Sequence, residues 1–165
     1  MVALIVGAAG FVGKHLIDYL KKNQDWEIHA TKLEDEKLIV HNVMVHNLDV
    51  LCKSSVNKLI QRVCPDYIFH LAAQSSVELS WMKPGLTIDI NIKGTVNILE
   101  SIRELQLGTR ILLVGSGEEY GAVGTENVPI NEDCPLNPQN IYAATKCCQN
   151  MLGSIYKSAY NMQII

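Results

Sequence analysis

The sequence has no excess of positive charge. Its 14 lysines and arginines are outnumbered by 17 aspartates and glutamates, so the formal net charge is −3. A basic surface is the electrostatic footprint of proteins that bind the phosphates of nucleic acid. We therefore expect no nucleic-acid partner.

Long apolar runs are also missing. No stretch approaches the roughly 20 apolar residues that a membrane-spanning helix needs, so we expect no membrane partner. The apolar run at residues 2–6 follows no basic residues and passes directly into a glycine-rich segment, unlike a signal peptide. These features favour a cytoplasmic protein.

Paired cysteines are a third absence. The five cysteines form no C-x-x-C pair, and no histidines stand at the spacing of metal ligands. An odd number of unpaired thiols is typical of a reducing compartment, and no metal site is expected. The five are Cys52, Cys64, Cys134, Cys147 and Cys148.

The N-terminal 13 residues carry the clearest motif. An apolar run at residues 2–6 is followed by Gly7, Gly10 and Gly13, and a helical pattern begins there. Glycine allows a sharp turn and a close approach of backbone to a pyrophosphate, which the helix N-terminus then attracts. The alternative is an ordinary glycine-rich turn between strand and helix. The cofactor-binding residues predicted here are Gly7, Ala9, Gly10, Phe11, Val12 and Gly13.

The remaining pattern alternates strand-like and helix-like segments. Apolar β-type runs occupy residues 2–6, 27–31, 42–45, 66–72, 110–114 and 162–165, and helical periodicity covers residues 12–20, 57–63, 88–102 and 141–160. This alternation predicts an α/β fold, a doubly wound parallel sheet with helices on both faces. Residues 1–165 are expected to form one domain. Because the last β-type run has no polar tail, we expect a longer protein.

The end of the second predicted strand distinguishes NADP from NAD. Sites for NAD place an acid there for the ribose 2′-hydroxyl, whereas a cation suits the 2′-phosphate of NADP. The strand at residues 27–31 is followed by Lys32, so we predict NADP(H), with NAD as the alternative. In that alternative Lys32 is a surface charge and Glu34 or Asp35 holds the ribose.

Asp49 follows the third predicted strand, beside Val50. It is a candidate for binding the adenine amino group. An aspartate in such a segment is also typical of a turn or helix cap.

Tyr142 and Lys146 lie four residues apart in the last predicted helix and so share one face. A nearby ammonium favours the phenolate form of tyrosine, which makes Tyr142 a candidate proton donor or acceptor at neutral pH. The alternative is a surface pair without chemistry.

Ser116 and Glu118 follow the fifth predicted strand in the segment GSGEEYG, residues 115–121. Ligands bind at the carboxyl ends of parallel strands. Ser116 could donate a hydrogen bond to the reacting oxygen and Glu118 could act as a base. The alternative for Glu118 is a solvated loop acid.

These motifs occur together in the order of one known family. With residues 70–77 (HLAAQSSV) and 91–95 (NIKGT), the sequence resembles the NAD(P)-dependent epimerase/dehydratase family of extended short-chain dehydrogenase/reductases, which remodel nucleotide sugars. The resemblance is strongest to the branch of GDP-4-keto-6-deoxy-D-mannose reductases and GDP-mannose 4,6-dehydratases. Residues 74–81 and 115–121 look most like the reductase.

The resemblance implies roles for the candidate residues. Tyr142 would exchange the proton on the sugar C4 oxygen, Lys146 would also hold the nicotinamide ribose, and Ser116 would position that oxygen. In a dehydratase the residue matching Glu118 removes the C5 proton. Gly117 departs from the aspartate of glucose-type dehydratases, which argues against their activity. The catalytic residues predicted are Ser116, Glu118, Tyr142 and Lys146.

The resemblance also extends the cofactor site along the chain. His70 and Asn91 have structural alternatives as a core histidine and a bridge between backbone groups. The further cofactor-binding residues predicted are Lys32, Asp49, Val50, Leu71, Ala72, Ala73, Gln74, Asn91, Tyr142 and Lys146.

The family implies a Rossmann fold that binds NAD(P), and a smaller C-terminal substrate domain that is missing here. The expected function is NADP(H)-dependent reduction of a GDP-linked 4-keto-6-deoxy sugar by a homodimer. The alternatives are GDP-mannose 4,6-dehydratase, another nucleotide-sugar epimerase or dehydratase, and a dinucleotide-binding redox sensor without catalysis.

Overall fold

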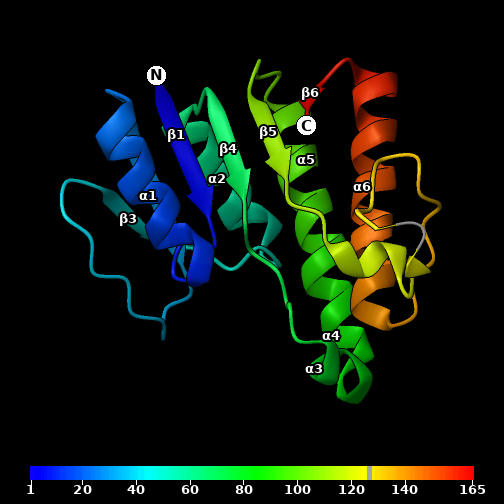
Figure 1. The fold of residues 1–165 in the computed structure, drawn as a ribbon. Helices are drawn as coiled ribbons and strands as arrows, with labels where there is room; N and C mark the ends of the chain where they lie inside the picture. Colours follow the sequence, from blue (N-terminus) through cyan, green and yellow to red (C-terminus); the bar gives the residue numbers. More distant parts are fainter. Residues whose placement is uncertain (126–127) are drawn as a thin grey trace.

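A computed structural model describes residues 1–125 and 128–165. A parallel sheet of six strands, in the order β3-β2-β1-β4-β5-β6, forms its centre (Figure 1). The strands are β1 (Val2–Val6), β2 (Glu27–Lys32), β3 (Met44–Asn47), β4 (Tyr67–His70), β5 (Arg110–Leu113) and β6 (Gln163–Ile164). The α/β doubly wound fold is therefore confirmed.

Helices lie in every connection between successive strands except the one from β2 to β3, which contains none. They are α1 (Phe11–Asn23), α2 (Lys53–Val63), α3 (Val77–Met82), α4 (Pro84–Ile88), α5 (Gly94–Glu104) and α6 (Ile141–Tyr160). A π-helical turn, η1 (Asp89–Lys93), joins α4 to α5, and a 3₁₀ helix, η2 (Gly117–Tyr120), follows β5. In the part of the chain that the structure describes, no helix is both long enough and apolar enough to cross a membrane.

β1 shows why a parallel strand is apolar throughout, because its side chains are buried on both faces of the sheet. Ala3 and Ile5 belong to the core under α1, together with Ile17 of that helix. Leu4 and Val6 belong to the opposite core, which packs against α2 and α5. The sheet is covered on both faces, as the alternating pattern predicts.

Several boundaries differ from the sequence prediction. β3 begins at Met44 rather than residue 42, and β4 is confined to Tyr67–His70. α2 begins at Lys53 rather than residue 57; the prediction missed its first turn because that turn has little apolar periodicity. The helix predicted at residues 88–102 begins inside α4 and passes through η1. α3 was not predicted, since six residues are too few for a helical period to show.

The strand order reverses at the middle of the sheet. The chain runs outward from β1 to β2 and β3, then returns to place β4 on the other side of β1. In open α/β sheets ligands bind at the carboxyl ends of the strands where the order reverses. The arrowheads of β1, β4 and β5 point to that edge in Figure 1.

Candidate active site

Gly7 and Gly13 are required by close packing at the reversal point. Gly7 has φ +83°, and a Cβ there would lie 2.6 Å from the Ala72 Cα at the end of β4. A Cβ on Gly13 would lie 2.2 Å from the Ala8 carbonyl oxygen. Any larger residue would therefore push α1 or the segment after β4 away from the end of β1.

The N-terminus of α1 is free to bind an anion. Its N-cap, Gly10, supplies no side-chain hydrogen bond, and the first turn has no acidic residue. Phe11 and Val12 are 87% and 54% exposed, so they do not cover the turn. Unpaired N–H groups and the positive end of the helix dipole suit a phosphate.

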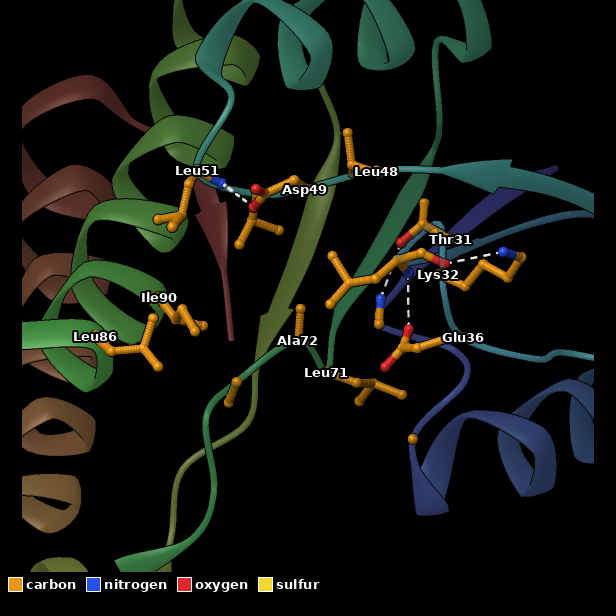
Figure 2. A pocket seen from close by; sticks show the side chains of 15 residues that line it. Thr31, Lys32, Glu36, Leu48, Asp49, Leu51, Leu71, Ala72, Leu86 and Ile90 are labelled. Carbon is orange, nitrogen blue, oxygen red and sulfur yellow. Dashed lines mark hydrogen bonds between the residues drawn. The ribbon is translucent and has the colours of Figure 1, made fainter. Parts of the chain in front are cut away.

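A first cavity, of about 320 Å³, lies on the β2 side of the glycine turn (Figure 2). Thr31 in its wall accepts a hydrogen bond from the Gly7 N–H through Oγ1, at 3.0 Å. Leu86 and Ile90 make the opposite wall apolar, as a flat heterocycle requires. The predicted cofactor residues that line this cavity are Gly7, Gly10, Lys32, Asp49, Val50, Leu71, Ala72 and Ala73.

Lys32 and Asp49 make local hydrogen bonds at this cavity. The Lys32 ammonium donates to the carbonyl oxygens of Leu33 and Glu34, at 2.9 and 3.1 Å. Asp49 accepts the Leu51 N–H at 2.9 Å, which is the turn bond of its structural alternative. Both side chains remain part of the cavity wall.

Glu36 is a residue of this cavity that the sequence prediction missed. It lies in the wall, as Figure 2 shows, and accepts the Leu33 N–H at 2.7 Å. Glu34 and Asp35, the acids named as ribose candidates, are not among the lining residues. The polar run at residues 34–37 has no periodicity that would show which acid turns back toward β2.

A second cavity, of about 290 Å³, continues past the N-terminus of α1. It shares Gly7, Gly10, Leu71 and Ala73 with the first cavity, so the two form one groove. Its far end is lined by Gly115, Tyr142 and Lys146. The groove therefore joins the glycine turn to the predicted tyrosine–lysine pair.

Tyr142 and Lys146 are both buried at this end of the groove, one helical turn apart on α6. The Lys146 ammonium donates to the Val114 carbonyl oxygen at 2.7 Å and to Gln149 Oε1 at 3.1 Å. Burial lowers the pKa of Lys146, because the charged form loses hydration. The helix places the phenol and the ammonium in one wall, as their spacing predicts.

Ser116 and Glu118 lie beside this cavity but are not lining residues. Ser116 Oγ accepts the Glu118 N–H at 3.2 Å and caps η2. Glu118 Oε2 accepts from Asn140 Nδ2 at 2.8 Å, and Asn140 caps α6 by accepting the Ala143 N–H. The structure thus links Glu118 to the start of the helix that carries Tyr142, and does not place it in the cavity wall.

Asn91 is buried and bridges two segments. Its Oδ1 accepts the Gln74 N–H at 2.8 Å, and its Nδ2 donates to the Gln74 carbonyl and to Thr145 Oγ1. This is the bridging role of its structural alternative. Gln74 and Asn91 therefore support the groove from behind the predicted lining residues.

His70 is also a core residue. Its Nε2 is 3.0 Å from Thr95 Oγ1, and that hydroxyl donates to the Asn91 carbonyl, so His70 is the donor of the pair. Burial, followed by the charge of Lys146, lowers the pKa of His70 to about 3. The imidazole is neutral at physiological pH.

The groove fits a pyridine dinucleotide in three respects. The glycine turn leaves room that a Cβ would fill, the α1 N-terminus has no side-chain cap, and a cation stands at the end of β2. In the described part of the chain, no group of three or more candidate side chains could hold a metal ion.

Comparisons with known proteins confirm the family that the sequence resembles. Residues 4–165 match the family model described as GDP-mannose 4,6 dehydratase. The chain is 31% identical over 149 residues to GDP-6-deoxy-D-mannose reductase of Pseudomonas aeruginosa, covering 90% of this chain and 44% of the relative. It is 29% identical to GDP-mannose 4,6-dehydratase of Vibrio cholerae, covering 97% of this chain and 46% of the relative. The chain thus spans about half the length of the curated relatives it matches.

Solved structures show a similar fold. UDP-glucose 4-epimerase of Thermus thermophilus in complex with NAD has a TM-score of 0.90 at 27% identity, covering 99% of this chain and 53% of that chain. RMD from Pseudomonas aeruginosa, complexed with NADPH, has a TM-score of 0.81 at 30% identity, covering 98% and 51%.

Proposed function

The chain belongs to the GDP-mannose 4,6 dehydratase family, and we propose that it binds NADP(H) in the groove and reduces a GDP-linked 4-keto-6-deoxy sugar at C4. The observation that carries this proposal is the continuity of the groove from the glycine turn to Tyr142 and Lys146. The named relatives include both a reductase of this substrate class and dehydratases.

The backbone of the glycine turn and α1 holds the cofactor phosphates in this proposal. Free N–H groups of the first helical turn donate to the pyrophosphate, and Gly7 and Gly10 let it approach. Lys32 exchanges its two carbonyl acceptors for the 2′-phosphate, a stronger acceptor because it is charged. The adenine lies between the apolar walls of the first cavity.

Tyr142 and Lys146 carry out the proton transfer in this proposal. When bound, the nicotinamide of NADPH would supply the hydride for the C4 carbonyl carbon and leave as NADP⁺. Tyr142 donates its phenolic proton to the C4 oxygen, so the ketone becomes an alcohol with hydride and proton accounted for. Lys146 stabilises the phenolate that remains, and Ser116 holds the C4 oxygen by a hydrogen bond.

Dehydration of GDP-mannose is the second candidate. Its support is Glu118, which by the resemblance matches the base that removes the C5 proton in a dehydratase. Glu118 would have to exchange Asn140 for the sugar, because its Oε2 now accepts from that amide at 2.8 Å. Reduction requires no such rearrangement, which is why we favour it.

Two incubations of the full-length natural protein test the proposal. GDP-4-keto-6-deoxy-mannose with NADPH should give a fall in absorbance at the reduced-nicotinamide band and a product in which the C4 ketone has become a hydroxyl. GDP-mannose with NADP⁺ should give no 4-keto product. The reverse result would establish the dehydratase, and binding of NADPH without either turnover would favour a redox sensor.

We also propose a homodimer in the cytoplasm. α6 carries exposed Met151 and Ile155 on its outer side, where a second copy could cover them. Sedimentation of the full-length protein at micromolar concentration should show a dimer, and a Met151→Asp variant should be monomeric.

A further inference from the structure

Glu119 is a buried acid that the proposed reaction does not use. It is only 3% exposed, although glutamate is rarely buried without a partner. It lies in η2, between Glu118 and Tyr120, directly after the strand that leads to the groove. A buried charge at this place requires a reason.

Both carboxylate oxygens of Glu119 accept hydrogen bonds from neighbouring elements. Oε1 accepts the Ser116 N–H at 2.7 Å, and Oε2 accepts from Asn150 Nδ2 on α6, also at 2.7 Å. A protonated carboxyl would turn one of these acceptors into a donor facing an N–H group. Both oxygens of the Glu119 side chain therefore act as acceptors.

Gly115 makes room for this carboxylate. A Cβ on Gly115 would lie 2.9 Å from Glu119 Oε1 and 3.4 Å from Asn150 Nδ2. Gly115 also lines the second cavity beside Tyr142 and Lys146. The carboxylate thus lies directly behind the wall of the groove, where the missing side chain leaves space.

The charge of Glu119 acts on Lys146. Burial lowers the pKa of Lys146, and Glu119 is the neighbour that opposes this effect. The other groups around the ammonium are the neutral Val114 carbonyl and Gln149 amide, with His70 of β4 kept neutral by burial. On α6 itself, Tyr142 is one turn earlier, and the pKa of the adjacent Cys147 thiol is raised by burial and by Glu119.

We propose that Glu119 is a positioning residue that links the Ser116 turn to α6 and places its carboxylate behind the wall that Gly115, Tyr142 and Lys146 form. This proposal rests on the proposed function, because it assigns Ser116, Tyr142 and Lys146 to the reaction. Glu119 itself touches neither substrate nor cofactor.

The test measures the pKa of Lys146 in the cofactor-free protein, by NMR of labelled lysine side chains assigned with a Lys146→Met variant. Glu119→Gln keeps the shape and one acceptor but removes the charge, so the pKa of Lys146 should fall below its wild-type value. The matched control is Glu104→Gln, which neutralises an exposed acid paired with Lys53 far from Lys146. An unchanged pKa in folded Glu119→Gln, or an equal fall in the control, would overturn the charge role.

Hydrogen exchange of the Ser116 amide tests the link that Glu119 makes between the Ser116 turn and α6. Glu119→Leu should speed its exchange about tenfold or more, because the N–H loses its acceptor, whereas Glu119→Gln should leave it protected. If Glu119→Leu does not fold, Asn150→Ala supplies the comparison: it frees the α6 end of Glu119 and keeps the acceptor of the Ser116 N–H, so it should speed the exchange by a smaller factor. Equal protection of this amide in the wild type and in all folded variants would contradict the positioning role.

Neither readout requires turnover. A protein that proves inactive with GDP sugars would contradict the proposed reaction and leave the pKa result intact. In an active enzyme, Glu119→Gln should also move the basic limb of the kcat profile to lower pH while leaving the Kd of NADPH unchanged.

Discussion

The two cavities of the groove are built from different kinds of groups. The first cavity is lined mostly by glycine, small and apolar residues, with Lys32, Glu36 and Asp49 at the β2 and β3 ends, and α1 presents backbone N–H groups between the cavities. The second is supported by buried polar and charged side chains, including Lys146, Gln149 and Glu119. The dinucleotide end therefore depends mainly on shape, whereas the reacting end depends mainly on charge and should respond to pH.

The largest expected effect comes from steric disruption of the glycine turn between the two cavities. Gly13→Ala places a Cβ 2.2 Å from the Ala8 carbonyl oxygen, so α1 must shift from β1. We expect a loss of about 3 kcal/mol in the free energy of unfolding and no measurable NADPH binding. Urea denaturation and calorimetry measure both.

Gly108→Ala is the matched control, because a Cβ there has nothing within 4 Å. It should leave stability and binding close to the wild type. A Gly13→Ala protein that binds NADPH normally would show that close packing is not what shapes the turn.

The next prediction distinguishes the chemical role of the second cavity from the binding role of the first. Tyr142→Phe removes the proton donor and keeps the ring, so turnover should fall about 100-fold or more while the Kd of NADPH is unchanged. Steady-state kinetics and fluorescence titration measure the two quantities. Equal loss of turnover and binding would mean that Tyr142 serves the cofactor rather than the reaction.

A smaller effect is expected from two of the three charged residues of the first cavity, Lys32 and Glu36 (Figure 2). Lys32→Ala should raise the Kd of NADPH about tenfold, the equivalent of about 1.4 kcal/mol, and leave that of NADH unchanged. Glu36→Gln should favour NADPH further. If the wild type prefers NADH and Glu36→Gln loses that preference, Glu36 is the ribose acid and the NADP assignment is wrong.

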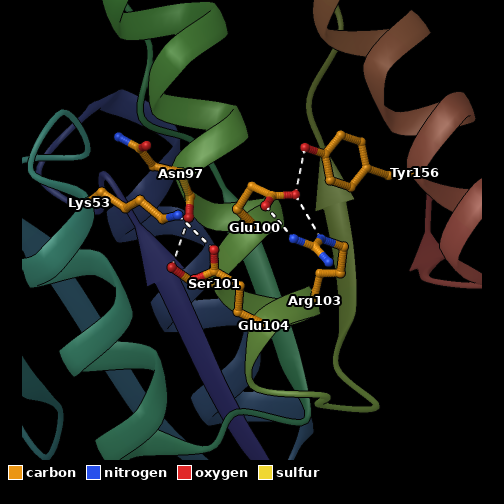
Figure 3. A network of polar contacts seen from close by, with 7 residues as sticks. All are labelled: Lys53, Asn97, Glu100, Ser101, Arg103, Glu104 and Tyr156. Atoms are coloured by element: carbon orange, nitrogen blue, oxygen red, sulfur yellow. Dashed lines mark hydrogen bonds and ion pairs between the residues drawn. The ribbon is translucent and has the colours of Figure 1, made fainter.

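The smallest effect lies outside both cavities, in the network of Glu100, Arg103 and Tyr156 between α5 and α6 (Figure 3). Hydrogen bonds from Arg103, followed by one from Tyr156, lower the pKa of Glu100 to about 2. A carboxyl whose pKa is lower in the folded than in the unfolded protein stabilises the fold at pH values above its unfolded pKa. This stabilisation is lost as the pH falls toward 2.

Glu100→Gln should therefore cost about 1 kcal/mol or less at pH 7, with the difference from wild type shrinking between about pH 4.5 and pH 2. Urea denaturation across that range measures it. NADPH binding and turnover at pH 7 should not change. A change in either would mean that the Glu100 network on α5 affects the geometry of the groove.

Local motifs explain why much of the groove was predictable from sequence. The glycines and the Tyr142–Lys146 spacing each specify their geometry within a few residues, and the structure places both along one groove, with the strand VALIV leading into it. Glu36 could not be found this way, because its position depends on how an irregular loop returns to β2.

The reacting end was less predictable. Ser116 and Glu118 follow a strand end, which is a valid signal for a ligand site, yet their side chains cap η2 and bind Asn140. Which of two adjacent glutamates is buried depends on the 3₁₀ turn, on Gly115 and on Asn150 from a distant helix. Such contacts between distant residues leave no period or spacing in the sequence.

A crystal structure of the protein with NADPH tests the central claim most directly. We predict the pyrophosphate at the N-terminus of α1, the adenine in the first cavity and the nicotinamide in the second, beside Tyr142. A dinucleotide bound elsewhere, or one whose nicotinamide points away from Tyr142, would contradict the account.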